Sequence, residues 1–236
     1  MQIPDLIGLR DRRYLDHTGV VEQRSIGDLM RYAALNQDTK DLGRYGGFVP
    51  GGIEFKTLPD PAARSRYSDE QLYALALFIY SLQQPPNPNR FDSLAAHGRQ
   101  VFAREGCARC HAPPLYTNNK LTSATGFTPA TGTLKDYDVL MASVGTDPSL
   151  ALRTRRGTGF YKVPSLKGLW YRRMFPHDGS CATLDDWFDP RRTSEDYVPT
   201  GFKGYGVQKR AVDGHHFGLE LSAEDRKALI AFLKTL

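Results

Sequence analysis

Five residues near the middle of the chain, Cys107-Ala-Arg-Cys-His111, constrain its fold more than any other stretch. Two thiols three residues apart lie on one helical turn, so each can add across a vinyl group of a porphyrin, and the histidine that follows then lies under the ring. This C-x-x-C-H spacing is typical of a covalent haem attachment site. We therefore predict that Cys107 and Cys110 bind one haem c, with His111 as an axial ligand of its iron.

Two other uses of this motif have weaker support. A structural zinc site normally takes two further Cys or His ligands at paired spacing, and the sequence has no second C-x-x-C. A thioredoxin-type redox pair needs a βαβ setting, which the flanking sequence does not provide. The third cysteine, Cys181, has no partner left in the chain, and we expect it to be a small filler residue without chemistry.

Composition limits the remaining classes of function. The chain has 236 residues, of which 40% are hydrophobic and 24% charged, a balance typical of folded globular domains. The net charge of +5 comes from scattered Lys and Arg, which argues against nucleic-acid binding and allows a weak preference for an acidic partner. No run is long enough to span a membrane. The 22 glycines and 15 prolines predict many loops.

An internal repeat organises the chain. Residues 4–19 and 164–179 align without a gap and are identical at eight of sixteen positions. The matches include a glycine at 8 and 168, a pair of arginines at 12–13 and 172–173, and a histidine at 17 and 177. Soon after each copy, a polar residue begins a short apolar turn; this residue is Ser25 in the first copy and Thr183 in the second.

Each copy also closes with a helix, over 68–82 and 222–236. Both helices begin with a Ser N-cap followed by acidic residues. Their apolar stripes are predicted to be Leu75, Phe78, Ile79 and Leu82 in the first, and Leu229, Phe232, Leu233 and Leu236 in the second. Residues 1–82 therefore look like the back half of one domain, 83–90 like a Pro-rich linker, and 91–236 like a whole domain.

The whole domain is expected to begin with a helix over about 92–105. Gly98 and Phe102 lie on one face of it, a small-then-aromatic spacing that lets another helix cross closely, and the obvious partner is 222–236. Residues 112–163 are rich in Gly and Pro. Loops of that length are expected to wrap around a haem that supplies much of the apolar core.

A second axial ligand is sought among His97, His177, His215, His216, Met141 and Met174. We expect His97 to be solvated, His177 to have a structural role in a turn, and Met174 to be a packing residue. The loop Gly214-His-His-Phe-Gly218 differs because its glycines allow the backbone to approach a planar ligand. From composition alone, a ligand and a pair of surface histidines are equally supported there.

Several motifs together resemble the bacterial di-haem cytochrome c peroxidase superfamily. They are Gly106–Pro114 around the C-x-x-C-H, Val163-Pro-Ser-Leu-Lys-Gly-Leu-Trp170, Pro176-His-Asp-Gly179, Thr183-Leu184 and the closing helix from Leu221. The resemblance implies an all-α fold of two class I cytochrome c-like domains with long loops, the first of them truncated and without a C-x-x-C-H. The resemblance also suggests a calcium ion between the two domains, to which no residues are assigned.

The same resemblance bears on the distal ligand. Peroxidases of the superfamily usually place a ligand methionine soon after the Thr-Leu helix start, and residues 185–192 contain none. Gly214–Gly218 instead resembles an element of the rubber-oxygenase-like branch, which implies that His215 is the distal ligand, with His216, Met174 and His177 as weaker alternatives. In the first half of the chain, Ile53 occupies the position that corresponds to His215. The resemblance therefore implies that a haem bound by an upstream segment would lack this distal ligand and have an open coordination position. His17 or Glu54 would line its pocket.

We therefore expect a periplasmic c-type cytochrome that transfers electrons through an iron held by His111 and His215, to a redox protein or a small-molecule partner. Its two nitrogen ligands predict a lower potential than a His/Met haem. The first alternative is a fragment of a di-haem peroxidase or oxygenase whose catalytic haem lies upstream; the second is a non-redox scaffold that has lost its haem. Met1-Gln-Ile-Pro lacks the features of a secretory signal, so we expect the natural chain to begin further upstream.

Overall fold

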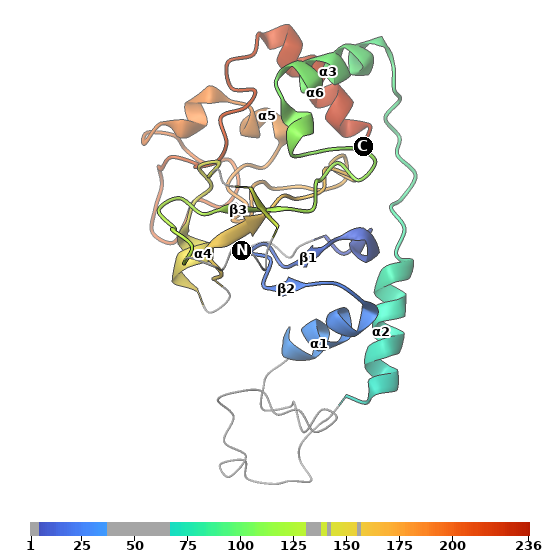
Figure 1. Cartoon of the computed structure of the whole chain (residues 1–236). Helices are drawn as coiled ribbons and strands as arrows, with labels where there is room; N and C mark the ends of the chain where they lie inside the picture. The colour runs from blue at the N-terminus through green and yellow to red at the C-terminus, as the bar shows by residue number, and fades with distance from the viewer. Residues whose placement is uncertain (1–4, 37–66, 131–137, 141–142, 155–156) are drawn as a thin grey trace. The chain divides into compact units, whose positions relative to one another are not determined.

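The computed structural model describes residues 5–36, 67–130, 138–140, 143–154 and 157–236 (Figure 1). Ile53, Glu54 and Met141 lie outside these ranges. The chain divides into two compact units. The N-terminal unit contains residues 5–15 and 21–83, and the C-terminal unit contains residues 16–20 and 84–236. No helix in the described part of the chain has the length and apolar content to cross a bilayer.

The C-terminal unit is built on two crossed helices, α3 (Ser93–Arg104) and α6 (Ala223–Lys234). Asp92 and Ser222 cap them by accepting a hydrogen bond from a backbone N–H in the first turn. A Cβ on Gly98 would collide with the carbonyl oxygen of Ala228 and would lie 2.8 Å from Cβ of Phe232. The predicted close crossing of these helices is confirmed. The predicted apolar stripe is also buried; it consists of Leu229, Phe232 and Leu233 in α6 and Leu236 just beyond its end.

The expectation of an all-α fold is wrong. Within the region expected to be loops, β3 (Leu121–Ser123) pairs antiparallel with β5 (Phe160–Lys162) and parallel with β4 (Val139–Leu140). A second sheet, in the residues described for the N-terminal half, joins β1 (Tyr14–Leu15) and β2 (Val21–Glu22). The fold is mixed α/β. The physical reason is that Thr122, Phe160 and Tyr161 favour extended backbone, and strand pairing satisfies buried backbone groups that a loop would leave unpaired.

Short elements complete the C-terminal unit: η4 (Cys107–Arg109), α4 (Ser149–Arg153), α5 (Leu184–Trp187) and η6 (Pro190–Thr193). Helix α5 begins with a capping box, in which Thr183 and Asp186 exchange side-chain and backbone hydrogen bonds. Trp187 at its end and Arg192 in η6 contribute to the site described below.

The N-terminal unit contains η1 (Leu9–Asp11), the β1–β2 pair, α1 (Ile26–Asn36) and α2 (Asp69–Ser81). Helix α2 starts with a capping box at Ser68. Its predicted apolar stripe is wrong in part: Leu75 is 42% exposed and Phe78 is 61% exposed, whereas Leu72 and Ala76 are buried. Helix α1 packs against the Leu72–Ala76 side, so that side forms the core.

The sequence repeat is matched by a repeat of local structure. Arg12 donates a hydrogen bond from Nη2 to the carbonyl of Ile7, at 3.2 Å, and at the equivalent positions Arg172 donates from Nη2 to the carbonyl of Lys167, at 2.7 Å. Further along, Asp28 accepts from the backbone N–H of the residue three positions before it, as Asp186 does. The copies therefore share a turn and a helix start.

Candidate haem site

The C-x-x-C-H segment turns sharply away from the end of α3. Gly106 has a left-handed φ of 75°, which ends the helix, and the N–H of His111 then bonds to the carbonyl of Cys107 at 2.9 Å. Both cysteines of the motif are free thiols and are partly buried. Burial raises the pKa of Cys107 to about 11 and also raises the pKa of Cys110, so both thiols are neutral at physiological pH.

The ring of His111 is held through Nδ1, which lies 3.2 Å from the carbonyl oxygen of Tyr116 and 3.1 Å from that of Pro164. A carbonyl only accepts hydrogen bonds, so Nδ1 carries the ring proton and Nε2 keeps its lone pair. Burial lowers the pKa of His111, which keeps the imidazole neutral at pH 7. This arrangement resembles the outer hydrogen bond that orients a metal-binding histidine.

The two carbonyls are themselves fixed by pairing between two segments. Thr117 donates from Oγ1 to the carbonyl of Val163 at 2.7 Å, and Ser165 donates from Oγ to the carbonyl of Leu115 at 2.6 Å. The N–H of Leu166 bonds to the Tyr116 carbonyl at 3.1 Å. The sheet β3–β5 continues this pairing, so it positions His111 in a way that free loops would not.

His215 lies in a loop that approaches an aromatic ring closely. A Cβ on Gly214 would collide with the ring of Trp187, so only glycine fits there. The Trp187 and His215 rings are perpendicular, with centroids 5.3 Å apart, and Phe217 lies 5.6 Å from His215. Nδ1 of His215 is buried without a hydrogen-bond partner. Burial lowers the pKa of His215 to about 4, with further lowering by nearby His111 and Arg192.

His111 is the second cause, after burial, of the lowered pKa of His215. Each is a neutral imidazole with a ring nitrogen free of hydrogen bonds: Nε2 of His111 by tautomer, and Nδ1 of His215 by its surroundings. Both side chains therefore have the chemistry of haem-iron ligands. Among the described residues, no group of three His, Cys, Asp or Glu could hold a metal ion.

The other predicted ligands lie in different settings. His97 is not simply solvated, because its Nε2 lies 2.9 Å from Oδ1 of Asp225. Met174 is 39% exposed, and its φ of 68° places it in a turn. His216 is exposed, unlike its neighbour.

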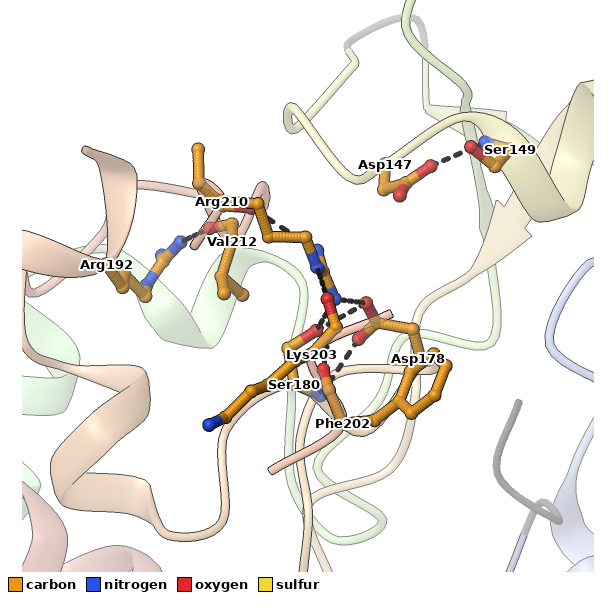
Figure 2. A network of polar contacts seen from close by, with 10 residues as sticks. Asp147, Ser149, Asp178, Ser180, Arg192, Phe202, Lys203, Arg210 and Val212 are labelled. Carbon is orange, nitrogen blue, oxygen red and sulfur yellow. Dashed lines mark hydrogen bonds and ion pairs between the residues drawn. The ribbon is translucent and has the colours of Figure 1, made fainter. Parts of the chain in front are cut away.

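His177 belongs to a polar and aromatic cluster of its own. Its ring stacks on Tyr161, with centroids 5.0 Å apart and an interplanar angle of 14°. Burial lowers its pKa. The next residue, Asp178, binds the guanidinium of Arg210 at 2.7 Å and also accepts from Ser180 (Figure 2). These contacts fit the predicted structural role of this turn.

Sequence reasoning missed Arg192 and Arg210, both of which are enclosed by backbone carbonyls. Arg210 donates to the Lys203 carbonyl at 2.7 Å, and Arg192 donates to the Val212 carbonyl at 2.6 Å (Figure 2). Nothing in the sequence separates Arg192 from the adjacent Arg191, which is exposed and pairs with nearby Asp189. Tertiary contacts alone distinguish them.

Comparison with known proteins adds a similarity of fold. No protein-family model matches the chain, and no curated protein matches it. Eleven chains of solved structures do match. One is described as the crystal structure of a MauG-like protein associated with microbial copper homeostasis; it is 18% identical, with a TM-score of 0.43.

The alignment covers 70% of this chain and 52% of that one, so the chain spans about half the length of the solved structure. A likeness this slight transfers no residue role. The description names a MauG-like protein and no rubber oxygenase, so the resemblance to that branch stays a prediction.

Proposed function

We propose that this protein is a c-type cytochrome that carries one covalent haem and transfers electrons through an iron ligated by His111 and His215. One observation carries the proposal. His111 is oriented by two carbonyls through Nδ1, which leaves Nε2 available, and His215 is a second neutral imidazole, with a buried Nδ1 that has no hydrogen-bond partner. Cys107 and Cys110, which come just before His111 in the chain, are free thiols.

The cysteines, the histidines and the carbonyls of the site each have a separate role. Each thiol would add its sulfur and its hydrogen across one vinyl double bond of a bound haem, so attachment would release no atom and need no oxidant. The haem, when bound, supplies a one-electron change at iron. The Tyr116 and Pro164 carbonyls hold the His111 ring and raise its basicity, and burial keeps both imidazoles neutral. Two nitrogen ligands favour a lower potential than a His/Met pair would.

The proposal extends to place and partner. Thioether attachment belongs outside the bacterial cytoplasm, which supports a periplasmic location. The partner would be a redox protein or a small-molecule electron donor or acceptor. The scattered charges of the chain give no reason to propose nucleic acid.

The direct test is maturation of the chain together with a haem-attachment system, followed by a haem stain after denaturing electrophoresis. We expect retained haem in the wild type and in Cys181→Ala, whose thiol is buried elsewhere, and none in the double variant Cys107→Ala/Cys110→Ala. Loss of low-spin spectra in His215→Ala, but not in Met174→Ala, would support the ligand assignment. Wild-type protein that retains no haem would refute the cytochrome.

A second candidate function is favoured by one face of α2. Ala74, Leu75 and Phe78 align through the repeat with Ala228, Leu229 and Phe232, the residues of α6 that α3 covers. In α2 this face is open: Leu75 is 42% exposed and Phe78 is 61% exposed. A counterpart of α3 from elsewhere would cover it, as in a fragment of a di-haem peroxidase or oxygenase.

The genomic DNA before the Met1 codon tests this alternative. An in-frame segment encoding a second C-x-x-C-H would support it, and we would then expect the longer chain to bind two haems and to bury Leu75 and Phe78. A stop codon close upstream would exclude it.

A further inference from the structure

Arg192 is fully buried, and its guanidinium connects three separate parts of the backbone. Nε donates to the carbonyl of Trp187 at 2.7 Å, Nη1 to that of Val212 at 2.6 Å, and Nη2 to that of His215 at 2.6 Å. In return the N–H of Val212 donates to the carbonyl of Arg192 at 2.7 Å. The side chain therefore fastens the loop that carries His215 to the end of α5 and to η6.

Trp187 restrains the same loop by packing against the imidazole ring of His215. The guanidinium carbon of Arg192 lies 4.1 Å from the centroid of the Trp187 ring, within cation–π range. That ring meets His215 edge to face, at 5.3 Å, and Gly214 packs directly on it. Arg192, Trp187 and His215 thus form one packed column, in which the backbone of His215 is bound at one end and its imidazole is confined at the other.

A lysine could not replace this arrangement. The guanidinium is planar and offers donors in a fixed fork, so one side chain reaches three carbonyls in three directions. An ammonium group is a compact point charge on a flexible stem, and it would leave some of the carbonyls without a donor. Burying a cation is costly unless its donors are satisfied, and here each guanidinium nitrogen of Arg192 has a carbonyl acceptor.

We infer that Arg192 is a positioning residue for the axial ligand: it fixes the 212–215 loop and so sets the position of the His215 imidazole before the haem is bound. The inference rests on the proposed function, because it assumes that His215 binds iron. It goes further by naming the residue that sets the ligand in place, and it predicts that the distal side of the haem opens when the guanidinium is removed.

The first experiment uses haem-loaded protein and compares Arg192→Gln with Arg192→Lys, with Arg191→Gln as the matched control. Arg191 is adjacent but exposed, and its side chain pairs with Asp189 outside the column. We expect attached haem in all three variants, since Cys107 and Cys110 are unchanged. Arg192→Gln should show a mixture of low-spin and high-spin spectra and should bind added cyanide at least about tenfold faster than the wild type, because the distal position is intermittently open.

Arg192→Lys should resemble Arg192→Gln, because the fork and not the charge holds the loop, and Arg191→Gln should resemble the wild type. The inference is overturned if Arg192→Gln stays fully low-spin with unchanged cyanide binding, or if Arg192→Lys restores the wild-type values. Should Arg192→Gln fail to fold, Arg192→Lys carries the comparison.

A second measurement on haem-free protein separates this inference from the proposed function. Exchange of the Val212 amide hydrogen reports the loop itself, and it should be at least about tenfold faster in Arg192→Gln than in the wild type or Arg191→Gln. If the wild type retains no haem, the proposed function fails, and unchanged Val212 exchange would then also overturn the positioning role. If haem is retained, with His215 as ligand, and neither spectra nor exchange respond to Arg192→Gln, only the positioning role fails.

Discussion

Replacing Gly98 by alanine tests the helix crossing that leads into the C-x-x-C-H segment. The added Cβ would collide with the Ala228 carbonyl oxygen and lie 2.8 Å from Cβ of Phe232. Relief requires α3 and α6 to separate, since the obstacle is backbone and cannot rotate away. Overpacking of a core typically costs about 1–3 kcal/mol, and a clash with fixed backbone lies at the upper end of that range. The gain of about 1 kcal/mol in helix propensity leaves a net loss of about 2 kcal/mol.

Gly27→Ala is the matched control, because Gly27 also lies in a helix, α1. A Cβ there would meet only Oγ of Ser25 at 3.4 Å and a guanidinium nitrogen of Arg31 at 3.6 Å, which are ordinary contacts. We therefore expect Gly27→Ala to stabilise its unit by up to about 1 kcal/mol, opposite in sign to Gly98→Ala.

Urea unfolding of haem-free protein measures both effects. Both tryptophans of the chain, Trp170 and Trp187, lie in the C-terminal unit, so their fluorescence reports that unit, and circular dichroism reports helices of both. Gly98→Ala should lower the fluorescence midpoint without changing the slope. A midpoint equal to or above that of the wild type would refute the argument from the crossing.

Three further predictions concern other parts of the C-terminal unit. The pKa of His215 falls from its usual 6.5 to about 4 on folding, so the unfolded chain binds more protons between these values; the stability of haem-free protein should decline as pH falls from 6.5 toward 4, and urea midpoints in His215→Gln should vary less with pH. Cys181 is buried and its pKa is raised to about 12, so a thiol reagent should label it slowly, only when the protein unfolds. This slow labelling phase should be absent in Cys181→Ala, and rapid labelling of Cys181 in native protein would contradict the prediction. Arg210→Met should cost about 2 kcal/mol in urea unfolding, because Asp178 loses its charge-assisted hydrogen bond from Arg210, whereas Lys209→Met, which removes an exposed pair, should be neutral; equal effects would count against the network.

Features governed by local chemistry were predictable. The Ser68 and Ser222 caps, the Gly98 crossing and the buried stripe of α6 follow from spacing along one helix, and the structure confirms each. The stripe of α2 was misjudged although its sequence resembles that of α6. Helix α2 has two apolar faces, and the helix that packs against it determines which one is buried. Here α1 packs against Leu72 and Ala76.

The sequence by itself determined that two thiols and a histidine lie on one turn, because three residues of backbone bring them there whatever surrounds them. It also determined the repeated turn, since a glycine and an arginine at fixed spacing close the same hydrogen bonds in both copies. Only the tertiary structure decided the rest. Pairing of β3 with β5 overturned the all-α expectation and placed two carbonyls on His111. The packing of His215 against Trp187, and the burial of Arg192 rather than Arg191, depend on segments distant in sequence, and no local pattern records which distant carbonyls a side chain will meet.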